Sequence, residues 1–169
     1  MRITRPLAAL ALAATAIAFT AATALAADAS AVNTPAASSA PKIIKWGPYN
    51  KGPVGTRATT RGVLHITGED HAILPTADQV RIIGQVSDLA TAKRLCGWAV
   101  FRISFFKKGQ PSHIVRGVYD CTYGTPKRFD LTFRDVYQVE LKVCVDPKLK
   151  EPSLTCRAAG TWKSLYVSK

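Results

Sequence analysis

The chain has 169 residues, only three of them histidine, and a formal net charge of +12 at pH 7. This length fits a single domain, and three histidines are too few for most metal sites. The excess of Lys and Arg favours anionic partners, with solubility alone as the plain alternative.

The first 26 residues have the features of an export signal. Arg2 and Arg5 are basic, Leu7–Phe19 is apolar, and Ala24 and Ala26 are the small residues that precede a cleavage site. Cleavage after Ala26 would remove two positive charges and no acid, which lowers the net charge from +12 to +10. Because no later apolar run has the length of a membrane span, we expect a secreted, extracellular protein without transmembrane anchoring.

Residues 27–60 are expected to form a disordered tail or arm. Asp28–Pro41 consists largely of Ala, Ser, Thr and Pro, which offer little surface to bury. Lys42–Gly62 is basic, contains no acid and is rich in glycine and proline. We place the domain boundary near Thr60, so that the folded domain spans residues 61–169.

The rest of the sequence predicts short strands, because β-branched and aromatic residues alternate with polar ones between turn residues. The expected strands are Val63–Thr67, Gln79–Val86, Gly97–Lys107, His113–Asp120, Lys127–Arg134, Tyr137–Val145 and Thr155–Val167, the last with a bulge around 158–160. Seven such strands predict an all-β fold, an antiparallel β-sandwich.

An even number of cysteines in a secreted chain predicts disulfides. A hairpin turn centred between Lys108 and Gly109 would set Cys96 opposite Cys121, and Trp98 opposite Tyr119. This register favours a Cys96–Cys121 bridge. A second local bridge between Cys144 and Cys156 is the simplest complement, although crossed pairings stay open.

The segment Asp135–Tyr137, followed by Val139, Leu141 and Val143, resembles the tyrosine corner of immunoglobulin-like and fibronectin-type domains. The resemblance implies that Tyr137 opens the penultimate strand and bonds back to the preceding turn. No cysteine lies on the second expected strand, so the inter-sheet disulfide of antibody domains is missing. The expected fold is therefore a generic immunoglobulin-like or fibronectin-like sandwich of about seven strands with two disulfides.

Seven residues of the basic arm interleave cations with aromatic rings. Cations neutralise phosphates or carboxylates, while rings stack on bases or sugars. The candidate binding residues are Lys42, Lys45, Trp46, Tyr49, Lys51, Arg57 and Arg61. They predict a monomeric, non-catalytic binding module for an anionic extracellular polymer or cell-surface component. The alternative is that Trp46 packs on the domain while the lysines stay in solvent.

The segment 147–152 suggests a different function, a protease inhibitor. Lys148, Leu149 and Lys150 lie between Pro147 and Pro152, above the expected Cys144–Cys156 bridge. A stiff exposed loop loses little entropy on binding. One of its lysines would enter the pocket of a trypsin-like extracellular protease.

A small secreted hydrolase is the second alternative. The stretch Thr60–Glu69, ending in Ile66–Glu69, resembles small secreted microbial ribonucleases, in which a catalytic Glu and Arg precede a His close to the C-terminus. Here the last histidine, His113, lies far from the C-terminus. His65, Glu69, Asp70 and His71 cluster without metal-ligand spacing. We therefore expect no catalytic residues, no metal and no cofactor.

Overall fold

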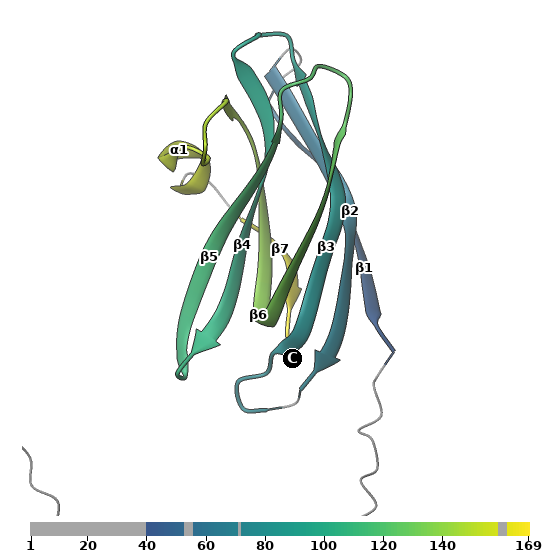
Figure 1. Ribbon diagram of the computed structural model, residues 1–169, viewed down its shortest axis with the longest axis vertical. Coiled ribbons are helices and arrows are strands. Elements are labelled where there is room, and N and C mark those ends of the chain that lie inside the picture. The colour runs from purple at the N-terminus through teal and green to yellow at the C-terminus, as the bar shows by residue number, and fades with distance from the viewer. Residues whose placement is uncertain (1–39, 53–55, 71, 159–161) are drawn as a thin grey trace, which may run out of the picture. The chain divides into compact units, whose positions relative to one another are not determined.

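The computed structural model describes residues 40–52, 56–70, 72–158 and 162–169. The expected signal peptide, 1–26, and the tail that follows it to residue 39 lie outside the described residues. Seven strands and one short helix are described: β1 Lys42–Lys51, β2 Thr56–Glu69, β3 Ala77–Ala90, β4 Leu95–Lys107, β5 Gln110–Asp120, β6 Lys127–Pro147, α1 Leu154–Ala158 and β7 Lys163–Val167. The all-β antiparallel prediction is confirmed (Figure 1).

One hydrogen-bonded sheet folds over itself into two layers, and β6 belongs to both. The strand order is β1-β2-β3-β6-β4-β5, with β7 also paired to β6. The first half of β6, up to Val136, pairs with β3, and the second half pairs with β4. We call β1, β2, β3 and the first half of β6 layer I, and β5, β4, the second half of β6 and β7 layer II.

The bend in β6 corrects two predictions. Lys127–Arg134 and Tyr137–Val145, expected as two strands, are one strand that changes partner near Asp135, whose φ is 54°. The pairing with β4 shifts register at the same place, between Ser104 and Phe105. Tyr137 therefore lies inside a strand rather than after a turn, and its ring contacts Phe106 with centroids 5.0 Å apart.

The immunoglobulin-like topology is not confirmed. Three consecutive strands, β1, β2 and β3, lie side by side in layer I. In immunoglobulin domains the second strand neighbours the fifth instead.

The expected irregular arm is wrong for residues 42–51, which form β1. This strand pairs with β2 from Lys42↔Ile66 to Lys51↔Ala58. Gly47 and Pro48, which suggested a loop, lie where the register shifts between Trp46 and Tyr49. Since a bulge tolerates Gly and Pro, these residues interrupt the ladder without ending the strand. The folded domain therefore begins well before Thr60.

The last predicted strand is also wrong in part. Residues 154–158 form α1, and only Lys163–Val167 is a strand. The backbone N–H of Cys156 donates to Ser153 Oγ at 3.1 Å, which makes Ser153 an N-cap. Of the expected bulge around 158–160, residues 159 and 160 lie outside the described residues. Within the described residues, no helix is long and apolar enough to cross a membrane.

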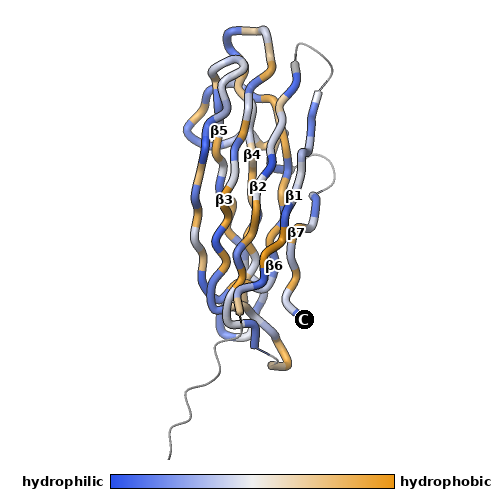
Figure 2. The backbone as a smooth tube through the Cα atoms, turned by 90° about the vertical axis from the view of Figure 1, so that its right-hand side faces the viewer, coloured by the Kyte–Doolittle hydropathy of each residue, from blue (hydrophilic) through white to orange (hydrophobic). Residues whose placement is uncertain are grey.

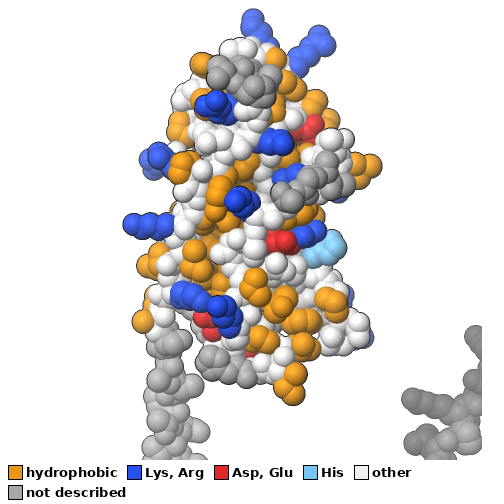
Figure 3. All heavy atoms as spheres, turned by 180° about the vertical axis from the view of Figure 1, so that it is seen from behind, with side chains coloured by type: hydrophobic (Ala, Val, Ile, Leu, Met, Phe, Trp, Pro, Cys, Tyr) orange, Lys and Arg blue, Asp and Glu red, His pale blue; other side chains and the backbone are white. Residues whose placement is uncertain are grey.

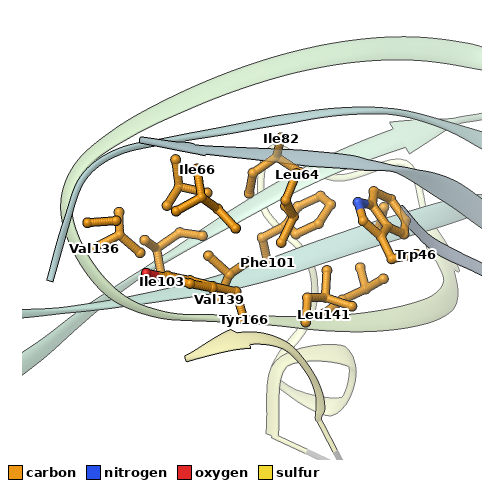
Figure 4. Packing of buried hydrophobic residues seen from close by; sticks show 14 of the residues in the cluster. Trp46, Leu64, Ile66, Ile82, Phe101, Ile103, Val136, Val139, Leu141 and Tyr166 are labelled. Atoms are coloured by element: carbon orange, nitrogen blue, oxygen red, sulfur yellow. The ribbon is translucent and has the colours of Figure 1, made fainter. Parts of the chain in front are cut away.

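The main core lies between the two layers. Leu64, Ile66 and Ile82 from layer I face Phe101, Ile103 and Leu141 from layer II, and all six are buried (Figure 4). Apolar and polar residues alternate along several strands in Figure 2, as expected when one side of a strand is buried.

Trp46 fills one end of this core because two glycines make room for it. Trp46, Gly62, Gly84 and Phe129 form a single row across the four strands of layer I. A Cβ at Gly62 would lie 2.5 Å from the Trp46 ring and 2.2 Å from the carbonyl oxygen of Ile83. The indole therefore lies over the glycines and stacks toward Phe129, with centroids 6.4 Å apart.

Layer II carries a second apolar cluster on its outer face, and both disulfides support it. The bridges are Cys96–Cys121 and Cys144–Cys156, which confirms the local connectivity. The β4–β5 register pairs Trp98 with Tyr119 as predicted, and their rings lie 4.6 Å apart. Trp98 is 1% exposed in a cluster with Val100 and the buried cysteines, and Trp162 packs against it.

Candidate anion-binding surfaces

The seven candidate residues of the arm do not form one patch, and Lys and Arg side chains are spread over the face of the domain shown in Figure 3. Trp46 is buried in the core, as the alternative of packing on the domain expected, so little of its ring is exposed for stacking on a ligand. Lys45 and Arg61 lie together in a shallow hollow, whereas Tyr49 and Lys51 line a separate groove. Long-range pairing of β1 with β2 separates these residues, because alternate side chains of a strand point to opposite faces.

The hollow lies on the outer face of layer I and has a volume of about 520 Å³. Lys45 of β1, Arg61 of β2 and Arg128 of β6 supply its cations, and Val63 and Ile83 contribute apolar surface. No acidic side chain lies among its lining residues. We call this site the layer I hollow.

Arg61 is positioned by a neighbour on the next strand. Arg61, Gln85 and Arg128 form one row across β2, β3 and β6. With the Gln85 amide turned so that its oxygen faces Arg61, this oxygen accepts from Nε and Nη2, each at 3.1 Å. A neutral partner orients the guanidinium without cancelling its charge.

A neighbouring cation on layer I is neutralised. Arg81 Nε donates to Asp130 Oδ1 at 2.9 Å, and this hydrogen bond lowers the pKa of Asp130 and raises that of Arg81. Both side chains are about half exposed, so the pair adds little stability. Its contribution is to remove the charge of Arg81 from the field around the hollow.

Lys42 is also engaged, at the far end of β1. Its Nζ lies 3.4 Å from Glu69 Oε2, and the hydroxyl of Tyr166 donates to Glu69 Oε1 at 2.8 Å. Burial, together with Glu69, raises the pKa of Tyr166 to about 12. This network joins β1 and β2 to β7. Arg57 is half-buried in β2 and lines neither the hollow nor the groove.

A groove of about 700 Å³ follows the edge of β6 that β7 leaves uncovered. Its lining residues are Pro48–Lys51 of β1, Leu141–Asp146 of β6, Ser153, and Thr155 and Cys156 of α1. Lys163, the first residue of β7, also lines it. We call this site the edge groove.

The predicted inhibitor loop is exposed and held at its base. Lys148, Leu149 and Lys150 are exposed, and the Cys144–Cys156 bridge closes the segment. The backbone N–H of Ser153 donates to Asp146 Oδ2 at 2.8 Å across the same base. The loop bends at Lys148 and Lys150 rather than extending as a strand. Protease inhibition stays a prediction.

The hydrolase residues are not gathered into one site. His65 lies on β2 of layer I, His113 lies on β5 of layer II, and Glu69 is occupied by Lys42 and Tyr166. In the described part of the chain, no group of three or more His, Cys, Asp or Glu side chains could hold a metal ion. His71 lies outside the described residues.

Sequence reasoning missed the partners that complete both sites. Arg128 joins the layer I hollow, and Lys142 and Lys163 join the edge groove. Arg128 and Lys163 are exposed and Lys142 is half-buried, and the residue pattern around each does not show which distant strand lies alongside.

Comparison with protein-family models, curated proteins and solved structures finds no match to this chain. The functional argument therefore depends on the geometry of these surfaces.

Proposed function

We propose that this protein is a secreted, non-catalytic module that binds an anionic extracellular polymer through the layer I hollow. The observation that carries the proposal is the convergence of Lys45, Arg61 and Arg128 on one hollow without an acidic lining residue. The export-signal pattern and the two disulfides support an extracellular location.

The spacing of the cations suits a linear polymer. Adjacent strands lie about 4.8 Å apart, so Arg61 and Arg128, two strands apart, are separated by roughly 10 Å at their backbones. Long side chains can then contact successive phosphates or carboxylates along a chain that crosses the strands. Such contacts release counterions, and binding weakens as salt rises.

Val63 and Ile83 add apolar surface to the hollow, and the backbone of the polymer can pack against it. The same hollow offers little for catalysis, because no carboxylate or histidine lines it. A general acid or base would have to lie within hydrogen-bond reach of the reacting group. Binding without turnover is the function that this set of residues supports best.

The test is retention on immobilised heparin over a range of salt concentrations. A triple variant, Lys45→Gln, Arg61→Gln and Arg128→Gln, should elute at lower salt and show a slope of log affinity against log salt smaller by about 2 to 3. The matched control removes the same charge elsewhere, with Lys93→Gln, Arg94→Gln and Lys148→Gln, all exposed. Equal losses in the two variants would contradict the proposal and favour a general effect of net charge.

A further inference from the structure

The edge groove contains three lysines without an anionic partner. Lys51, Lys142 and Lys163 all line it, and none forms a salt bridge within the described residues. The one acidic lining residue, Asp146, accepts the backbone N–H of Ser153. The groove therefore has an excess of positive charge.

Lys142 is the most unusual of the three, because its ammonium is buried. Its Nζ is inaccessible to solvent and has no hydrogen-bond partner in the described part of the chain. Burial and then the charge of Lys51 lower the pKa of Lys142. Buried charges in proteins are ordinarily paired, because an unpaired one loses its hydration without compensation.

Aromatic rings offset this cost only in part. Lys142 Nζ lies 5.8 Å from the centroid of the Trp162 ring, and Lys163 Nζ lies 5.3 Å from that of Tyr49. A ring face attracts a cation but does not accept the directed hydrogen bonds of an ammonium group. An anion in the groove would supply them when the Lys142 side chain turns toward it.

The other residues that line the edge groove indicate what the rest of the ligand should be like. Pro48 of β1, which is exposed, and Val145 of β6, which is half-buried, give the groove apolar surface, while Leu141 and Val143 are buried. A volume of about 700 Å³ is in the range of small-molecule pockets, roughly 300 to 1,000 Å³. Apolar surface with a few convergent charges fits an amphipathic anion.

We propose that the edge groove binds a small molecule that carries a carboxylate or phosphate group on an apolar body, with the anionic group held by the exposed Lys51 and Lys163 and by Lys142 once its ammonium turns from its buried position into the groove. This site is independent of the layer I hollow, whose cations Lys45, Arg61 and Arg128 do not line the groove. The two proposals can therefore fail separately.

The experiment is isothermal titration calorimetry of the full chain with 1-naphthyl phosphate, 1-naphthoate and the neutral 1-naphthol. The two anions should bind with one site per chain. The neutral 1-naphthol should bind at least about tenfold more weakly, because a charge-assisted hydrogen bond is lost. Comparison of phosphate with carboxylate shows which anionic group the lysines prefer. Equal binding of 1-naphthol would overturn the assignment of an anion site, and no binding of any probe would overturn the site itself.

The variant Lys142→Met keeps an apolar stem and removes the buried charge. It should weaken 1-naphthyl phosphate binding at least about tenfold, while Lys93→Gln, at an exposed lysine that lines neither site, leaves the affinity unchanged. The thermal midpoint of Lys142→Met should equal or exceed that of the parent protein, because an unpaired buried charge is gone. A second variant, Lys163→Gln, is exposed and should also lower affinity. Unchanged affinity in both variants would overturn the proposal.

Discussion

The outer faces of the two layers differ in what lies on them. On layer II, Trp98, Val100 and the Cys144–Cys156 bridge form an apolar cluster with Trp162 packed against it. On layer I, the row of Arg61, Gln85 and Arg128 is polar, and both arginines are exposed. The outer face of layer II thus carries a second small core, while the arginines on the outer face of layer I are exposed and can contact a partner.

This difference explains why β4 is apolar on both sides. A strand that is buried on both faces carries a nearly continuous apolar run. Ala99, Phe101 and Ile103 face the main core, and Trp98 and Val100 face the second cluster. The Cys144–Cys156 disulfide and α1 lie at the apolar outer face of layer II. The exposed arginines lie on the outer face of layer I.

The largest effect is expected from removing the indole of the second cluster. Trp98→Ala should lower the free energy of unfolding by about 3 to 5 kcal/mol, because a large buried side chain is replaced by a cavity. Chemical denaturation monitored by circular dichroism measures this loss. Arg128→Ala, on the outer face of layer I, is the control and should change stability by less than about 0.5 kcal/mol. Similar losses at both positions would contradict the distinction between the two faces.

A smaller, pH-dependent effect is expected where the two layers meet. The backbone N–H of Asp88 in β3 donates to Asp120 Oδ2 in β5 at 3.2 Å, and both side chains are buried. Burial, and to a lesser extent the charge of Asp120, raises the pKa of Asp88 above its ordinary value of 3.8. Between these two pKa values the folded state binds more protons than the unfolded state, so this group contributes stability that is lost as pH rises.

Asp88→Asn removes that titration and keeps an oxygen that can accept the Ala90 N–H, as Asp88 Oδ1 does at 2.8 Å. Relative to the parent protein, the variant should be more stable at pH 7, and its advantage should disappear below the ordinary pKa of 3.8. Urea denaturation at pH 7 and pH 3 measures the difference. An advantage of the same size at both pH values would mean that the Asp88 charge plays no part.

The smallest effect on stability is expected in the loop that follows β6. Lys148 and Lys150 are exposed, so replacing both by alanine should change the free energy of unfolding by less than about 0.5 kcal/mol. The same double variant tests the protease-inhibitor alternative: it should raise the inhibition constant measured against a trypsin-like protease. An unchanged constant, or no inhibition by the parent protein, would remove that alternative.

The sequence by itself determined the features that depend on near neighbours in the chain. Strand alternation predicted an all-β fold, and the turn at Lys108 and Gly109 set the register that joins Cys96 to Cys121. These interactions are local, so the residue pattern carries them directly. The expected arm failed for the same reason: Gly47 and Pro48 suggest a loop locally, and only pairing with β2 shows that they interrupt a strand.

Only the tertiary structure decided which distant residues share a surface. Arg128 lines the layer I hollow with Lys45 and Arg61 because β6 pairs with β3. Lys142 lines the edge groove with Lys51 and Lys163 because the end of β1 lies along the edge of β6. The change of partner within β6, near Asp135, produces both arrangements. Strand pairing over long sequence separations depends on the packing of the whole domain, so local patterns do not specify it.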